Sequence, residues 1–205
     1  KHNQRVSMAT RKSKHSRTEK ADPMIAAGRL HDTIEDGYIF VFSDAHYWPG
    51  EATTAHRGMI ALIKELKPKI VVCNGDAFDG ASISRHPRIG WDSAPSVTEE
   101  LEAVRVRLAE IEKAAKGASL YWPIGNHDAR FETYLADKAP QFEGVAGFAL
   151  KDHFPAWTPC MSVWINGDLV IKHRLGGGAN AASTNARTSG KSMVTGHLHS
   201  LKVSP

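Results

Sequence analysis

Cysteine is scarce in this sequence, long apolar runs are missing, and no signal-peptide pattern opens the chain. The two cysteines, Cys73 and Cys160, are too few for a disulfide framework. Cys73 lies in an apolar run, where a cysteine usually serves as a small core side chain. No apolar stretch approaches the roughly 20 residues that cross a bilayer. These absences argue against a disulfide-stapled scaffold and a membrane-spanning protein, and we expect a cytoplasmic protein without membrane contact.

An excess of basic over acidic residues is missing from most of the chain, although the net charge of the whole sequence is +4. Seven of the 26 Lys and Arg residues lie within residues 1–20, with one of the 22 acids, so 19 basic and 21 acidic residues remain for the rest. A polar basic tail without apolar periodicity is typical of a solvated arm. We therefore expect a basic, flexible arm over residues 1–22 and one compact domain over residues 23–205. That domain lacks the broad basic face of a duplex-binding protein.

The chain is organised around an apolar run that leads to a carboxylate. Residues 70–73 are short and β-branched, as in a buried parallel strand, and Asp76 follows them. Four other strand-like runs also lead to polar side chains, which are Asp44 and His46, Asn126 and His127, His173, and His197 and His199. Ligands bind at the carboxyl ends of strands in open α/β sheets, and Asp, Asn and His bind divalent metals. The pattern predicts a metal site where these strand ends meet.

Apolar periodicity and turn residues predict the elements between these strands. Helices are expected over residues 55–66, 97–116 and 130–138, and Ser96-x-x-Glu99 is a capping-box pattern at the start of the second helix. The dipeptide Asn166-Gly167 predicts a tight hairpin turn. Residues 176–191 are small and polar, so a flexible loop is expected there. Residues 21–37 and 141–162 carry no clear pattern.

A long loop rich in Gly, Ser and Pro follows Asp79 and carries Arg85, Arg88 and Trp91. Loops beside a site often select the substrate, and cations with an aromatic face suit a phosphate and its base. We take Arg85 and Arg88 as candidate substrate-binding residues. The alternative is an ordinary surface connection.

Taken together and in order, the polar motifs resemble those of the calcineurin-like metallophosphoesterase superfamily, of the phage and bacterial type. The motifs are Asp44-x-His46, Gly75-Asp76-x-x-Asp79, Gly125-Asn126-His127-Asp128, His173 and Gly196-His197-x-His199. The resemblance extends over residues 38–199. It implies an α/β fold in which two mixed β-sheets pack as a sandwich flanked by helices, with a dinuclear metal site along one edge.

The resemblance also implies a role for each motif residue. One metal is expected on Asp44, His46 and His199 and the other on Asn126, His173 and His197, with Asp76 bridging them. His127 is expected to contact the phosphate and protonate the leaving oxygen, and Asp79 to orient His127. Two cations clamp a phosphoryl group and acidify a water for in-line displacement. Mixed nitrogen and oxygen ligands suit divalent manganese, which we favour, and also Fe, Zn or Ni.

Departures from the superfamily pattern bear on the substrate. Its serine/threonine protein phosphatases have an arginine after the second motif and a glutamate at the end of the third, where this chain has Gly80 and Asp128. Arg174 also replaces the usual glycine after His173. We therefore favour a phosphodiesterase acting on a nucleotide or single-stranded nucleic acid. The alternatives are a phosphomonoesterase or protein phosphatase, and a non-catalytic interaction module on the same fold.

Two further properties stay open in the sequence. Nothing in it indicates an oligomeric state. Members of this superfamily usually continue past the last motif with more strands, so truncation at the C-terminus is one interpretation of the end at Pro205.

Overall fold

The strands of the protein form two four-stranded sheets in the computed structural model, which describes residues 28–87, 90–91 and 93–204. The first sheet has the order β1-β6-β7-β8, with strands Arg29–Asp32, Ser162–Ile165, Leu169–Ile171 and Ser192–Val194. The second has the order β2-β3-β4-β5, with strands Ile39–Phe42, Ile70–Cys73, Ser119–Pro123 and Thr158–Cys160.

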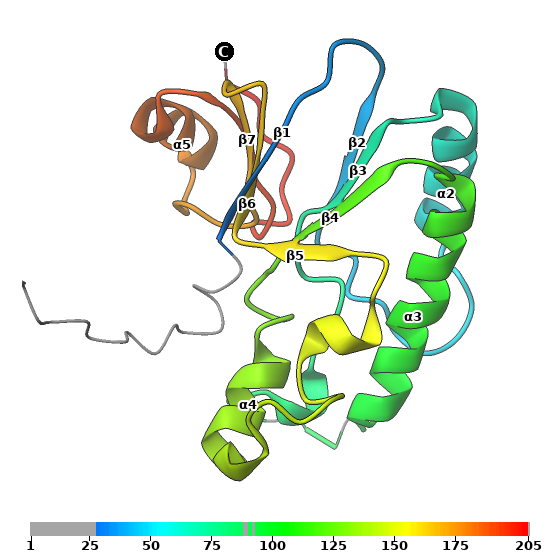
Figure 1. Ribbon diagram of the computed structural model, residues 1–205. Helices are drawn as coiled ribbons and strands as arrows, with labels where there is room; N and C mark the ends of the chain where they lie inside the picture. The colour runs from blue at the N-terminus through cyan, green and yellow to red at the C-terminus, as the bar shows by residue number, and fades with distance from the viewer. Residues whose placement is uncertain (1–27, 88–89, 92, 205) are drawn as a thin grey trace, which may run out of the picture.

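Helices cover the outer faces of both sheets (Figure 1). Helices α2 (Thr54–Leu66) and α3 (Val97–Ala114) lie on the side of the second sheet, and α5 (Ala181–Ser189) lies beside the first sheet on the opposite side. Helix α4 (Arg130–Lys138) follows β4. The short 3₁₀ turns are η1 (Ala81–Ile83), η2 (Pro140–Phe142) and η3 (Leu150–His153). The layers run helix, sheet, sheet, helix, which confirms the predicted α/β sandwich flanked by helices.

Strand direction explains why several strand ends meet. Strands β2, β3, β4 and β5 are parallel, whereas in the first sheet β6 and β7 pair antiparallel between two parallel pairs. The expectation of two mixed sheets is therefore right for the first sheet, while the second is parallel throughout its described strands. Parallel neighbours need crossover connections, which α2 and α3 supply. The carboxyl ends of β2, β3 and β4 consequently lie at one edge.

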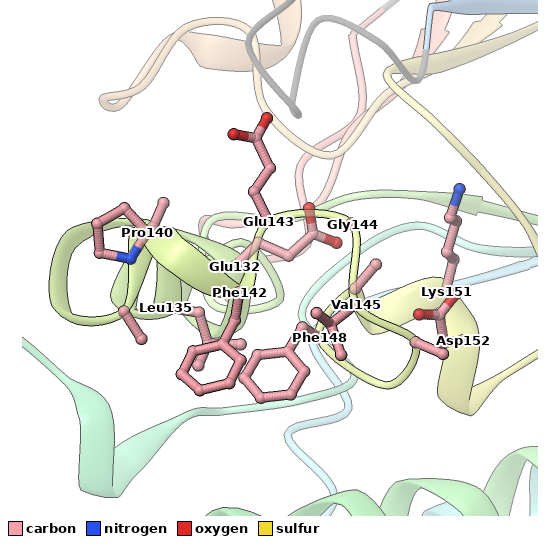
Figure 2. A pocket seen from close by; sticks show the side chains of 14 residues that line it. Glu132, Leu135, Pro140, Phe142, Glu143, Gly144, Val145, Phe148, Lys151 and Asp152 are labelled. Atoms are coloured by element: carbon pink, nitrogen blue, oxygen red, sulfur yellow. The ribbon is translucent and has the colours of Figure 1, made fainter.

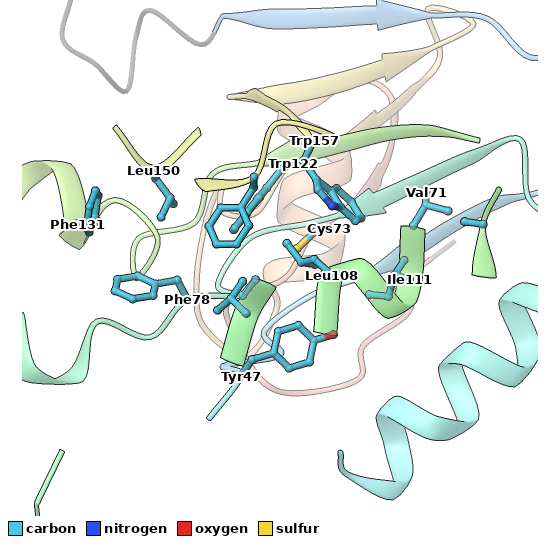
Figure 3. Packing of buried hydrophobic residues seen from close by; sticks show 14 of the residues in the cluster. Tyr47, Val71, Cys73, Phe78, Leu108, Ile111, Trp122, Phe131, Leu150 and Trp157 are labelled. Atoms are coloured by element: carbon cyan, nitrogen blue, oxygen red, sulfur yellow. The ribbon is translucent and has the colours of Figure 1, made fainter. Parts of the chain in front are cut away.

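The core lies on both faces of β3. Because alternate residues of a strand point to opposite faces, Ile70 and Val72 pack between the sheets, whereas Val71 and Cys73 face the helices. The helix-side cluster includes Leu108 of α3 (Figure 3). Burial of a side chain of this size contributes roughly 1.5–3 kcal/mol. A strand that is buried on both faces must be apolar throughout, which explains the uninterrupted run at residues 70–73.

Most of the predicted local elements are confirmed. The three predicted helices are observed as α2, α3 and α4, and α3 begins at the predicted capping box, in which Ser96 and Glu99 bond reciprocally. The hairpin of β6 and β7 forms around Asn166 and Gly167, both at positive φ.

One segment differs from the predicted structure, and two others had no predicted structure. The predicted flexible loop at 176–191 is wrong, because it contains helix α5. That helix has weak local signals, and tertiary contacts hold it: Ala181 and Asn185 are buried, and the Asn185 amide exchanges two hydrogen bonds with the backbone of Gly176. Strands β1 and β5 lie in segments without a clear pattern, and each is held by pairing with a distant strand.

The predicted basic arm, residues 1–22, lies outside the described residues. Within the part of the chain that the structure describes, every helix is too short or too polar to span a bilayer.

Candidate metal centre

Five strands deliver polar side chains to one edge of the two sheets. Strand β2 leads to Asp44 and His46, β3 leads to Asp76 and Asp79, and β4 leads to His127. Strand β7 leads to His173, and β8 leads to His197 and His199. Backbone bonds join these strand ends: the Asp44 amide donates to the Gly75 carbonyl at 3.0 Å, and the Gly196 amide donates to the His173 carbonyl at 2.9 Å. At the edge that the sequence predicts, the ends of β2 and β3 are thus joined to each other, and so are the ends of β7 and β8.

A first group of ligand-type side chains consists of Asp44, His46 and His199, with ligand atoms within 4.8 Å of one another. His199 Nε2 lies 3.3 Å from Asp44 Oδ1, and the His197 amide donates to both carboxylate oxygens of Asp44 at 2.9 Å. His46 Nδ1 bonds Asp79 Oδ1 at 2.9 Å, and this bond raises the pKa of His46 against the opposing effect of burial. His46 Nε2 is left buried and without a hydrogen-bond partner among the described residues.

A second group consists of Asp76, His173 and His197, again with ligand atoms within 4.8 Å of one another. His173 Nδ1 bonds the Asn74 carbonyl at 2.8 Å, which fixes the ring and leaves Nε2 turned toward Asp76. Nε2 lies 3.0 Å from Asp76 Oδ2 but forms no hydrogen bond of acceptable geometry. Two metal-ligand atoms lie close together without hydrogen-bonding geometry when both point toward the same third position.

The charge states in the second group follow from burial and contacts. Burial alone would raise the pKa of Asp76, but the interactions with His173 and His127 outweigh it, so the pKa of Asp76 is lowered. The pKa of His197 is lowered by burial first and then by the charges of His173 and Arg174. An ionised Asp76 beside a neutral His197 is the state that binds a cation.

The backbone of both groups is strained. In the described part of the chain, seven non-glycine residues have positive φ, and five of them are Asp44 (55°), His46 (39°), Asp76 (56°), His197 (73°) and His199 (47°). The left-handed region costs such residues about 1–3 kcal/mol each and is concentrated at functional sites. Strain gathered on the predicted ligands therefore supports a functional site.

Gly125 lets β4 approach this edge. A Cβ atom at Gly125 would collide with Asp76 Oδ1 and would lie 2.6 Å from the Asp76 amide nitrogen. With glycine in place, the His127 amide donates to Asp76 Oδ1 at 2.8 Å. Only glycine leaves room for this contact.

His127 and Asp79 form a pair beside the two groups. His127 Nδ1 lies 2.6 Å from Asp79 Oδ1, and the His127 and His46 rings meet edge to face with centroids 4.6 Å apart. Hydrogen bonds from His127 first and His46 second hold the pKa of Asp79 well below its usual range. Asp79 is therefore a carboxylate at neutral pH that holds the Nδ1 side of the His127 ring.

Two buried acids that the sequence analysis left without a role hold the loop between Asp76 and Ala81. Asp128 accepts hydrogen bonds from the amides of residues 76, 77, 78 and 125 and from the Trp122 indole. Glu100 accepts from the amides of Gly80 at 2.6 Å and Ala81 at 3.0 Å. Burial raises the pKa of both acids. A sequence signal for Glu100 did exist. It lies one helical turn before Val104, so a carboxylate falls on the apolar face of the predicted helix.

The donor set suits transition metals. Each group offers two imidazoles and one carboxylate, a mixture that favours Mn, Fe, Zn or Ni over Mg or Ca. The buried, unpaired Nε2 atoms of His46 and His173 point to ligands whose second nitrogen is already oriented by a hydrogen bond. The residues present therefore fit divalent transition-metal ions.

Three predicted site residues are not drawn into these groups. Asn126 is exposed, and its side chain forms no hydrogen bond within the described residues. Arg85 is exposed and has no ion pair with a described residue. Arg88 lies outside the described residues.

A cavity of about 670 Å³ lies away from this edge, between α4 and residues 139–152 (Figure 2). Its lining is mostly apolar, with Phe142 and Phe148 stacked at 4.9 Å, and its charged lining residues are three acids and Lys151. None of the predicted site residues lines it. In spite of its size, this cavity is not a suitable phosphate site, because its excess of acidic side chains repels an anion.

Comparison with known proteins gives one match. The sequence pattern of the family described as calcineurin-like phosphoesterase matches residues 37–200, a range that contains every motif residue from Asp44 to His199. No curated protein and no solved structure matches the chain.

Proposed function

The chain belongs to the calcineurin-like phosphoesterase family, whose members are metal-dependent hydrolases of phosphate esters, and from this premise we propose a dinuclear phosphodiesterase acting on a nucleotide or single-stranded nucleic acid. One observation carries the proposal: two groups of metal-binding side chains lie side by side along one sheet edge, with His127 and Asp79 next to them. A non-catalytic scaffold has no need of both features.

In this proposal Asp44, His46 and His199 would hold one ion. His173 and His197 of the second group, together with Asn126, would hold the other, and the ionised Asp76 would be a ligand of both. When bound, the two ions offset the charge of the phosphate and acidify a water molecule for attack. Manganese is the favoured metal, and Fe, Zn and Ni suit the same donors.

His127 supplies the proton for the leaving group. Its Nδ1 is held by Asp79 at 2.6 Å, so the imidazolium form of His127 gives up its proton from Nε2 and keeps the proton on Nδ1. Nε2 can donate to a phosphoryl oxygen and then to the leaving alkoxide, a contribution of roughly 10²–10⁴ in rate. The carboxylate of Asp79 stabilises the imidazolium and fixes the ring.

Two features favour a diester of small size. Trp91, in the loop after Asp79, is fully exposed and offers an open face on which a base can stack, and Arg85 in the same loop is exposed. The near-neutral body, with 19 basic and 21 acidic residues after residue 20, argues against a duplex. A nucleotide or a single strand reconciles both features.

The test is a substrate panel with metal removed and restored. Chelated protein should be inactive and should regain activity with Mn. Single-stranded and double-stranded DNA, RNA, cyclic nucleotides and phosphomonoesters are compared at fixed salt, with and without residues 1–20. Cleavage of monoesters alone would refute the diester preference. No turnover of any ester by protein that holds two metals would support the interaction module instead.

A further inference from the structure

Arg130 lies at the start of α4, against both members of the His127–Asp79 pair. Its Nη1 donates to the Asp79 carbonyl at 2.9 Å, and its Nη2 lies 3.4 Å from His127 Nε2. The side chain is only 21% exposed. A guanidinium therefore stands next to the nitrogen that carries the transferable proton.

The charge of Arg130 is only partly offset by its neighbours, because its ion pair with Asp79 is long. Asp79 Oδ1 already accepts from His127 and His46, and Arg130 Nη1 lies 3.9 Å from it, too far for a hydrogen bond. Arg130 forms no other ion pair within the described residues. Glu100 is near enough for its pKa to be affected by Arg130, yet its carboxylate is committed to two backbone amides.

Arg130 and His127 present two nitrogens at close range. Arg130 Nη2 can only donate a hydrogen bond, and at 3.4 Å its contact with His127 Nε2 is a long one. Two nitrogens 3.4 Å apart can both reach one oxygen atom at ordinary distances of about 2.8–2.9 Å. This geometry suits one anionic oxygen shared by the two nitrogens.

Packing holds the guanidinium in this place. The stem of Arg130 lies over Gly80, where an added Cβ would be 3.2 Å from Arg130 Cβ and 3.3 Å from Arg130 Cδ. Gly80 is in turn held by Glu100 through its amide at 2.6 Å. A cation that is positioned before the ligand arrives loses little entropy on binding.

We propose that Arg130 is a substrate-binding residue whose Nη2, together with His127 Nε2, donates hydrogen bonds to one non-bridging oxygen of the substrate phosphate. The inference rests on the proposed function, since a phosphate ester must enter this site. Arg174 is the other arginine whose charge reaches the centre, but it is exposed and has no hydrogen bond to a described residue. Of the two, only Arg130 is partly buried and lies against His127.

The test measures binding of inorganic phosphate to Mn-loaded protein by calorimetry, and competitive inhibition by phosphate where turnover exists. Arg130→Met keeps an apolar stem over Gly80 and deletes the charge. It should weaken phosphate binding roughly 10- to 100-fold, because a hydrogen bond to a charged group contributes about 1.5–3 kcal/mol. Arg130→Lys should fall between, since one ammonium cannot copy the guanidinium fork. The control is Arg105→Met, which removes an exposed arginine paired with Glu102 on α3 and should leave binding unchanged.

Metal content and melting temperature separate binding from structure. Weaker phosphate binding by Arg130→Met at full metal content and unchanged melting temperature supports the inference. If that variant does not fold, Arg130→Lys decides by the same criterion. The inference is overturned if the Arg130 variants turn over substrate and bind phosphate as tightly as the wild type does. It is also overturned if the wild-type protein binds no phosphate. Arg130-dependent phosphate binding without turnover of any ester supports it and overturns the proposed function.

Discussion

His127 Nδ1 lies 2.6 Å from Asp79 Oδ1, the same oxygen that bonds His46 Nδ1 at 2.9 Å. One carboxylate atom thus orients both the proposed acid and a proposed metal ligand. The hydrogen bond to Asp79 raises the pKa of His46, and the bonds from His127 and His46 keep the pKa of Asp79 well below its usual range. In the proposed mechanism, Asp79 therefore couples proton transfer to metal binding.

Asp79→Asn should lower turnover roughly 10- to 100-fold, because residues that orient a ligand or an acid usually contribute that much. The amide has no charge and cannot stabilise a protonated His127. Steady-state kinetics with Mn present checks this. Asp137→Asn, an exposed acid paired with Lys138, is the matched control and should match the wild type. Unchanged turnover in Asp79→Asn would remove Asp79 from the mechanism.

His127→Ala and Asp76→Asn should separate chemistry from metal binding. His127→Ala should retain both metals and lose roughly 10²–10⁴ in turnover, since only the proton donor is removed. Asp76→Asn should lose metal too, because the shared ligand loses its charge. Elemental analysis of the purified variants checks the prediction. Equal metal loss in both variants would contradict the assigned roles.

Gly125→Ala should abolish metal binding and destabilise the fold, because its Cβ would collide with the Asp76 carboxylate. Gly58→Ala is the control. Gly58 lies inside α2, has no heavy atom within 4 Å of an added Cβ and has no positive φ, so alanine should stabilise the protein by roughly 0.5–1 kcal/mol. Urea unfolding and metal titration measure both effects. A metal-binding Gly125→Ala protein would show that β4 can shift at no cost.

Glu100→Gln should change how stability depends on pH. Burial raises the pKa of Glu100 above its ordinary value of 4.5, so the folded protein binds this proton more tightly than the unfolded chain. The resulting stability is complete below about pH 4.5 and is lost as the pH rises through the raised pKa. The Glu100→Gln variant should not show this loss of stability, because glutamine does not titrate. Urea unfolding of metal-free protein across pH 4–8, with exposed Glu102→Gln as control, measures the difference; parallel curves for wild type and Glu100→Gln would disprove it.

The sequence alone determined the elements that carry their own signal. The buried run at 70–73, the capping box at Ser96 and the Asn166-Gly167 turn are local patterns with local causes, and each was predicted correctly. The order of the polar motifs after five strands was enough to identify the family and the edge where the site lies. The roles of the individual site residues stay predictions.

Tertiary structure alone decided what depends on distant partners. Helix α5 is stable through contacts such as that of Asn185 with Gly176, while five of its nine residues are Ser, Thr or Asn, which are weak helix formers. Glu100 reaches the amide of Gly80, and Arg130 lies against Asp79 and His127, at distances that no spacing in the sequence encodes. A sequence shows which side chains follow which strand, but the packing of the two sheets determines which of them share one carboxylate, and on that sharing rests the proposal that Asp79 links the acid to the metal site.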